Sequence, residues 1–214
     1  MIKNLFLGIL AIILIGIGGL VYRNASEHPT QQIACPLDAM ICPDGTSVGR
    51  TGTGCTFPAC PPPNVSLSSV GIAYAVPDGF TETSSTDAAA VASYLSTGTS
   101  TQPSSILIRR YPIDASSTPL ETIQATAISG TSGQPVPATA FSSKVLGTHR
   151  FTVVSIERFE GVIDTAYYLS RAHDVLRFDA IDRGVTNWTS PSLDVSTLTA
   201  QRAAVSLLTS LQGQ

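Results

Sequence analysis

Hydrophobic residues are distributed along the chain in three different ways. One uninterrupted apolar run covers residues 5–22, and residues 27–64 contain few large apolar side chains. From residue 65 onward, apolar positions alternate with polar ones or recur at helical spacing. This pattern predicts three parts: a membrane-spanning segment over residues 1–26, a tether with a cysteine-rich module and a proline-rich linker over 27–64, and a folded domain over 65–214.

The apolar run Leu5–Tyr22 contains no charged residue. A helix of about 18 residues is roughly 27 Å long, close to the hydrocarbon thickness of a bilayer. We therefore expect a transmembrane helix that acts as a signal anchor. The alternative is a cleaved signal peptide, whose apolar core is usually only about 7–15 residues long. Cleavage after Ala25 would also place Arg23 at the third position before the cut.

The first half of the folded domain combines alternating and helical patterns. Alternation predicts strands over 71–76 and 106–111. Residues 86–95 carry three alanines followed by Val91, Tyr94 and Leu95, which favours a short helix. A second helix is expected over 118–129, because Thr118, Pro119 and Glu121 form a capping box with proline at the first helical position.

The second half predicts a meander of antiparallel strands. Alternating segments at 142–146, 150–159, 162–170 and 175–181 are separated by short turns. Such short connections are compatible with antiparallel but not with parallel neighbours. A closing helix is expected over 195–211 with one apolar face. The predicted fold class is therefore α+β, with an antiparallel sheet covered by helices.

Several of these segments resemble the fold shared by the photosystem II extrinsic protein PsbP and the nuclear-transport factor Mog1. They are Ala-Tyr-Ala-Val-Pro-Asp-Gly-Phe at 73–80, the strand at 106–111, Val-Leu-Gly at 145–147, Thr-Ala-Tyr-Tyr at 165–168 and the closing helix. The resemblance implies a PsbP/Mog1-like domain with a binding or assembly role. It implies no shared catalytic residues.

The four cysteines, Cys35, Cys42, Cys55 and Cys60, all lie in the module before the folded domain. This stretch is rich in Gly, Pro and Asp-Gly turns and too poor in large apolar residues to build a core, so we expect two disulfides to hold it. Four cysteines allow three pairings, and the spacing does not choose among them. A zinc site is the alternative, although only Cys55 and Cys60 approach the usual ligand spacing. Disulfides would place the amino terminus in the cytoplasm and the remainder outside.

Residues 41–60 resemble part of a Kazal-type module, which implies a protease inhibitor as one alternative function. The stretch departs from that family because a Kazal module has six cysteines and its loop is shorter than that between Cys42 and Cys55. The same residues also resemble a short Cys-Pro-Asp-Gly module of anchored bacterial proteins. The simplest interpretation is a spacer held by disulfides, followed by the stiff break of residues 61–64.

Composition argues against several classes of partner. Charged residues make up only 13% of the chain, and the formal net charge is −3. The sequence has no basic stripe, so nucleic acid is not an expected partner. It has no phosphate-binding loop, dinucleotide fingerprint or zinc-protease helix, and we expect no cofactor.

Few residues suggest catalysis. His149 and His173 fall in predicted turns, where side chains are usually solvated, and a hydrolase would need a nucleophile beside one of them. His173, Asp174, Asp179 and Asp182 could suggest a metal site, but strand alternation places Asp179 and Asp182 on opposite faces. We therefore predict no catalytic residue and no metal site, and a hydrolase of unknown substrate stays an alternative.

Aromatic residues give a weak indication of a binding surface. Tyr167 and Tyr168 are neighbours on a predicted strand, so one should face the core and the other outward. Trp188 lies in a predicted loop nearby. We accordingly predict a membrane-anchored, extracytoplasmic binding or assembly domain of the cell envelope, with these three residues as the candidate surface. The expected partners are the membrane and an envelope protein or small ligand.

Overall fold

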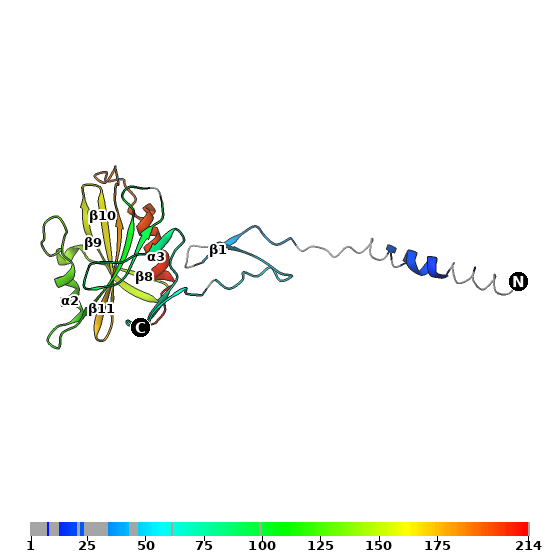
Figure 1. Ribbon diagram of the computed structural model, residues 1–214, viewed down its shortest axis with the longest axis horizontal. Coiled ribbons are helices and arrows are strands. Elements are labelled where there is room, and N and C mark those ends of the chain that lie inside the picture. The colour runs from blue at the N-terminus through cyan, green and yellow to red at the C-terminus, as the bar shows by residue number, and fades with distance from the viewer. Residues whose placement is uncertain are drawn as a thin grey trace. The chain divides into compact units, whose positions relative to one another are not determined.

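The structure is a computed structural model that describes residues 8, 13–20, 22–23, 34–42, 47–60, 62–98 and 100–213 (Figure 1). Its contacts form two compact units. One contains Met1–Asp38 and Gly49–Pro58, and the other contains Ala39–Val48 and Ala59–Gln214. The predicted domain boundaries at residues 26 and 64 stay a prediction.

Residues 13–20 are helical. Much of the predicted anchor Leu5–Tyr22 lies outside the described residues, so the anchor also stays a prediction. Within the described part of the chain, no helix has both the length and the apolar character needed to cross a bilayer.

The cysteine-rich segment is cross-linked by two disulfides, as the sequence predicted. Cys35 is bonded to Cys55, and Cys42 is bonded to Cys60. The described chain contains no free cysteine, so the alternative of a zinc site is wrong for this structure. Two short strands, β1 (Ala39–Ile41) and β2 (Ser47–Gly49), pair with each other beside these bonds.

Arg50 links the two ends of its own segment. Its Nε atom donates to the Asp38 carboxylate at 2.8 Å, and its Nη1 atom donates to the Cys55 carbonyl at 3.0 Å. The guanidinium also lies over the Phe57 ring, 4.2 Å from the centroid. The Arg50 side chain thus cross-links the segment from Asp38 to Phe57.

Seven strands of the described chain form one antiparallel sheet (Figure 1). In spatial order they are β5 (Phe80–Glu82), β6 (Ala90–Ser96), β7 (Ser105–Pro112), β11 (Asp174–Asp182), β10 (Val162–Ser170), β9 (His149–Phe159) and β8 (Ser142–Leu146). The predicted meander is confirmed as β8, β9, β10 and β11. A bulge between Asp164 and Thr165 shifts the register of β10 against β9.

The predicted helix at residues 86–95 is wrong, because most of this segment forms strand β6. Its apolar side chains follow a period of two, with Ala92 and Tyr94 buried on the same face. The strand pairs with β5 on one side and β7 on the other. Alanine favours helices only weakly, and the two pairing partners outweigh that preference.

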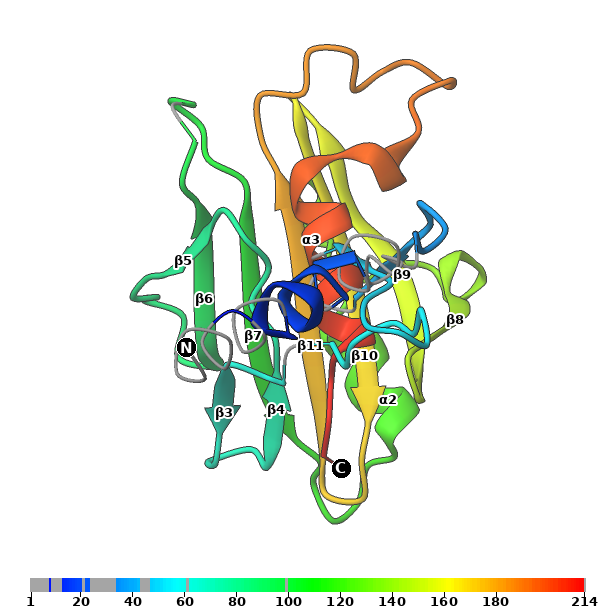
Figure 2. The same cartoon turned by 90° about the vertical axis from the view of Figure 1, so that its right-hand side faces the viewer.

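Both faces of the sheet carry a helix (Figure 1). The larger core lies under α3 (Thr199–Thr209), whose Ala200, Ala204, Leu207 and Leu208 pack against the sheet. Figure 2 views the sheet from this side. On the opposite face lies α2 (Pro119–Thr126). Its Ile123 and its C-cap residue Ala127 belong to a smaller apolar cluster.

The two helices begin for different reasons. At α2 the predicted capping box is confirmed: the Glu121 N–H donates to the Thr118 hydroxyl, and the Glu121 carboxylate accepts from the Thr118 N–H. The closing helix begins four residues later than predicted, because Val195–Thr197 forms a separate 3-10 turn, η2. A further 3-10 turn, η1, covers Ala138–Ala140.

Asp182, at the end of β11, provides the cap that α3 lacks locally. Its carboxylate accepts from the backbone N–H groups of Ala200 at 2.8 Å and Gln201 at 3.3 Å, and from the Ser104 hydroxyl at 2.7 Å. A buried carboxylate at this position satisfies backbone donors that have no partner within the helix. Asp182 therefore joins the central strand to the closing helix.

A two-stranded sheet closes the α3 side. Strand β3 (Val65–Leu67) pairs with β4 (Ile72–Tyr74), which is shorter than the predicted strand at 71–76. Ala73 also bridges to Gln212 after the closing helix. The buried hydroxyls of Tyr74 and Tyr94 lie 2.7 Å apart, so each satisfies the other.

Candidate binding site on the sheet face beneath α2

The two predicted turn histidines lie near each other, but in the described chain neither ring is hydrogen-bonded to a serine or cysteine. Both line one cleft at the β10–β11 turn. His149 contacts the Thr148 hydroxyl and the Gly213 carbonyl, and in the described chain the His173 ring makes no hydrogen bond. The hydrolase alternative therefore gains no support from these histidines, because neither is bonded to a serine or cysteine. Among the described residues, acids, histidines and cysteines form no group that could hold a metal ion.

The predicted aromatic surface is only partly available. Tyr167 and Tyr168 point to opposite faces, as alternation requires, but both are buried because a helix covers each face. The expectation that one of them faces outward is wrong. Trp188 is half-buried and contacts the partly exposed Phe159 edge to face, with ring centroids 5.8 Å apart. Its role in binding stays a prediction.

The structure instead shows a polar cleft of about 400 Å³ on the face that carries α2. The helix and the residues after it form one wall, through Thr126, Ile128 and Gly130. The other lining side chains come from β7, β9, β10 and β11, together with Asp87 before β6. Strands from both sides of the central strand therefore contribute to a single concave surface.

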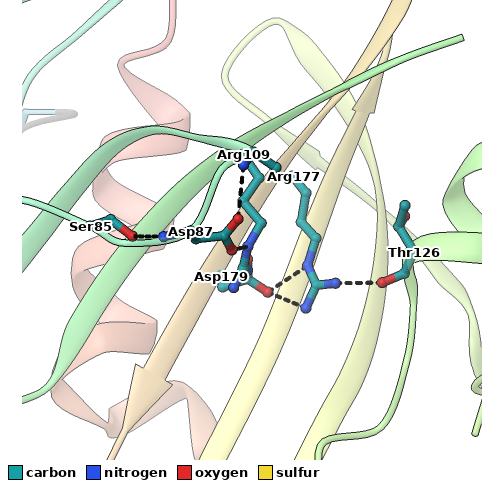
Figure 3. A network of polar contacts seen from close by, with 7 residues as sticks. Ser85, Asp87, Arg109, Thr126, Arg177 and Asp179 are labelled. Carbon is teal, nitrogen blue, oxygen red and sulfur yellow. Dashed lines mark hydrogen bonds and ion pairs between the residues drawn. The ribbon is translucent and has the colours of Figure 1, made fainter. Parts of the chain in front are cut away.

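A chain of ion pairs forms the floor of this cleft (Figure 3). Arg109 on β7 lies directly opposite Arg177 on β11, an arrangement in which like charges repel. Asp179 offsets this repulsion by accepting hydrogen bonds from both guanidinium groups, including one from Arg177 Nε at 2.6 Å. Arg109 Nε also donates to Asp87 at 2.6 Å. Two arginines are thus held in fixed positions by two acids.

Each end of this series of ion pairs is hydrogen-bonded to the backbone. Arg177 Nη1 donates to the Thr126 carbonyl at the end of α2, at 2.6 Å. The Asp87 carboxylate accepts from the Ala89 N–H at 2.9 Å. The hydrogen bond from Arg109 and that backbone contact hold the pKa of Asp87 below its ordinary value. The Asp87 carboxylate is consequently ionised at neutral pH.

Asp164 lines the same cleft but has no partner. Its Oδ1 atom is buried and makes no hydrogen bond within the described chain. Burial raises the pKa of Asp164 well above its ordinary value, and the nearby Asp179 carboxylate raises it further. Because Asp179 is bonded to two guanidinium groups, we assign the proton of this coupled pair to Asp164. A neutral carboxyl therefore lies among arginines.

Tyr168 lies beside Arg177 on the same face. The Arg177 guanidinium is 5.6 Å from the centroid of the Tyr168 ring, close enough for a cation–π contact. Burial raises the pKa of the Tyr168 hydroxyl to about 12, so the group stays neutral. Tyr168 thus supports the floor of the cleft.

A second cleft of about 440 Å³ adjoins the first, and both are lined by Ile181 and Arg183. Its lining is rich in hydroxyl and amide groups, from Thr83, Ser84, Ser93, Thr101, Gln102 and Ser105. Arg183 donates to the Ser105 hydroxyl at 3.0 Å and is largely exposed. The two clefts form a continuous polar surface with Arg183 at their junction.

Sequence reasoning did not identify this site, although β11 carried a signal. Val175, Arg177 and Asp179 alternate with Leu176 and Phe178, so two charged residues share a face with an apolar one. Charges at that spacing usually indicate a solvated face. Here the face is buried, and only the tertiary structure shows that Arg109 lies opposite.

No protein-family model and no curated protein matches this chain. Among solved structures, a protein from Bacteroides thetaiotaomicron VPI-5482 is 9% identical with a TM-score of 0.41, covering 67% of this chain and 45% of that one. LpqN, involved in cell envelope biogenesis of Mycobacterium tuberculosis, is 16% identical with a TM-score of 0.43, covering 65% and 81%. This chain thus spans less than half of the Bacteroides protein. Neither weak similarity identifies a function, and the resemblance to PsbP and Mog1 stays a prediction.

The pKa of Asp164 predicts a specific pH dependence of stability. A carboxyl whose pKa is raised in the folded state stabilises fully below its unfolded pKa of about 3.9, and that contribution is lost as pH rises through the folded value. Asp164→Asn should therefore be more stable than the wild type at neutral pH, by about 1 kcal/mol or more in the free energy of unfolding. The difference should shrink as the pH approaches 4.

Denaturant unfolding of both proteins across this pH range provides the measurement. Asp78→Asn is a matched control, because Asp78 is exposed and makes no side-chain hydrogen bond within the described chain. A variant Asp164→Asn that is less stable than the wild type at neutral pH would show that Asp164 is ionised and paired.

Proposed function

We propose that this protein is a non-catalytic binding domain that a single amino-terminal helix anchors to a membrane and displays outside the cytoplasm. The ligand occupies the polar cleft beneath α2. The observation that carries the proposal is that Asp164 lines that cleft while its buried Oδ1 has no hydrogen-bond partner within the described chain. Buried polar atoms in folded proteins nearly always have partners, and a ligand can supply the one missing here.

The charge of the cleft favours a neutral ligand. Among the described lining residues, Arg109, Arg177 and Arg183 face the carboxylates Asp87 and Glu157, with Asp179 bonded beneath them. With Asp164 protonated, positive and negative groups are equal in number. A charged ligand would therefore gain no net attraction from this surface.

The hydrogen-bonding groups favour a ligand with many hydroxyls. A protonated carboxyl donates and accepts, guanidinium groups only donate, and carboxylates only accept. The adjoining cleft adds serine and threonine hydroxyls, and the half-buried ring of Tyr111 provides an apolar wall. Sugar units combine donor and acceptor hydroxyls with an apolar ring face, so we propose a neutral saccharide of the cell envelope as the ligand.

The extracytoplasmic location is supported by the disulfides. Bonds such as Cys35–Cys55 and Cys42–Cys60 form and persist mainly in oxidising compartments. The apolar run Leu5–Tyr22 precedes them and has the length of a spanning helix. These two features together support an amino terminus in the cytoplasm and a domain on the opposite side of the membrane.

Cysteine labelling in intact cells tests the location. The wild type should react with a membrane-impermeant maleimide only after reduction, because all four cysteines are paired. Cys35→Ser leaves Cys55 without its partner and should react without reduction. Labelling of the unreduced wild type, or failure of Cys35→Ser to react in intact cells while reacting in lysed cells, would contradict the proposed topology.

Binding to a glycan array tests the ligand class. The full chain, held in a detergent without a sugar headgroup, should bind neutral oligosaccharides such as those of N-acetylglucosamine and not oligogalacturonate. Asp164→Leu and Arg183→Met should each weaken binding by about tenfold, the loss of about 1.4 kcal/mol. Both act through the cleft by removing its hydrogen-bonding groups.

Arg202→Met is the matched control, because Arg202 is exposed on α3 and lines neither cleft. Its affinity should equal that of the wild type. Preference for the acidic oligosaccharide, or equal binding by Asp164→Leu and the wild type at matched thermal stability, would refute the proposal.

A further inference from the structure

A third cleft, separate from the two that meet at Arg183, lies beside the β10–β11 turn. It has a volume of about 680 Å³ and contains Arg110, Arg171, His149, His173 and Asp174. The buried side chains of Val70 and Leu169 contribute its apolar part. It combines several cationic or ionisable groups with a single carboxylate, unlike the balanced cleft beneath α2.

Asp174 holds the two arginines in place. Its Oδ1 accepts from Arg171 Nε at 2.6 Å, and its Oδ2 accepts from Arg171 Nη2 at 2.7 Å and Arg110 Nε at 2.6 Å. Burial alone would raise the pKa of Asp174, but these hydrogen bonds outweigh it and hold the pKa below its ordinary value. The carboxylate is ionised, and one guanidinium charge remains in excess.

Each of the three guanidinium nitrogens of Arg171 already donates a hydrogen bond within the protein. Both of its contacts to Asp174 are supplemented by a hydrogen bond from Nη1 to the Val70 carbonyl. Its side chain is only 14% exposed. Arg171 therefore orders the turn and neutralises Asp174 in the cleft that both residues line.

Arg110, in contrast, keeps its outer nitrogens available. Only Nε is hydrogen-bonded within the described chain, and 43% of the side chain is exposed. Both oxygens of Asp174 are occupied, so this carboxylate orients the guanidinium without covering its outer edge. A planar guanidinium fixed in this way can donate two parallel hydrogen bonds to one oxyanion.

The two histidines also differ in whether their rings are already hydrogen-bonded within the protein. His149 Nε2 lies 3.0 Å from the Gly213 carbonyl, which can only accept, so this nitrogen carries the proton and its ring is engaged. His173 sits in the turn next to Asp174, is exposed, and makes no ring hydrogen bond in the described chain. Its ring can therefore donate to a ligand in the cleft.

We propose that this cleft binds an oxyanion, a phosphate or carboxylate group of a ligand, through the outer nitrogens of Arg110 and the ring of His173. Asp174 and Arg171 act as positioning residues. The apolar part at Val70 and Leu169 accommodates the carbon skeleton that carries the anionic group. The site is independent of the saccharide proposed for the cleft beneath α2.

Calorimetric titration of the full chain in a detergent free of phosphate tests this proposal. The probes are inorganic phosphate and acetate, each compared with chloride at the same ionic strength. We expect at least one of the two oxyanions to bind and chloride not to compete. Arg110→Met should raise the dissociation constant at least tenfold, Arg110→Lys less, and His173→Ala severalfold, whereas Arg202→Met should leave it unchanged.

Thermal unfolding with and without the oxyanion separates binding from folding. A lower melting temperature of Arg110→Met with the wild-type increment on adding the anion would show a purely structural arginine and overturn the proposal. Equal binding of phosphate, acetate and chloride would overturn it as well. Because no sugar is used, these outcomes are distinct from failure of the saccharide proposal.

Discussion

Strand β11 lies in the middle of the sheet, and both of its faces are covered, so each polar side chain on it needs a partner inside the protein. Leaving one such group unpaired costs about 1–3 kcal/mol. Asp182 meets this requirement by capping α3, and Asp174 by binding the arginines near the hairpin turn. Arg177 and Asp179 meet it by pairing with each other, and Asp179 also pairs with Arg109. The closing helix, the turn and the floor of the cleft thus all depend on one strand.

Asp164 stands apart from this pattern. Buried ion pairs seldom add stability over apolar packing, because the charges must lose their water. The ion pairs of Arg177 and Arg109 with Asp179 therefore contribute little to the stability of the fold. Asp164 lowers the stability further, because its buried Oδ1 has no partner within the described chain. Perturbed carboxyls of this kind gather at functional sites, which is why we place the ligand there.

Local signals predicted the parts of the fold that depend on neighbouring residues. Short turns predicted the meander, and the capping box at Thr118 predicted the start of α2. The strand β6 was missed because its alanines suit a helix and its partners lie outside the segment. One of Tyr167 and Tyr168 was expected to face outward, since alternation tells which residues share a face but not what covers that face. The cleft was missed for the same reason, as Arg109 and Arg177 meet only in the sheet.

The most direct test of the proposed binding site is to measure the pKa of Asp164. Carboxyl carbon NMR of the folded protein, labelled at aspartate, can follow Asp164 and Asp87 in one pH titration. We expect Asp164 to keep its proton well above the ordinary aspartate pKa of about 3.9, whereas Asp87 loses its proton below that value. Ionisation of Asp164 at or below the ordinary value would mean that it is paired, and the cleft would lose the unsatisfied group on which the proposed binding site rests.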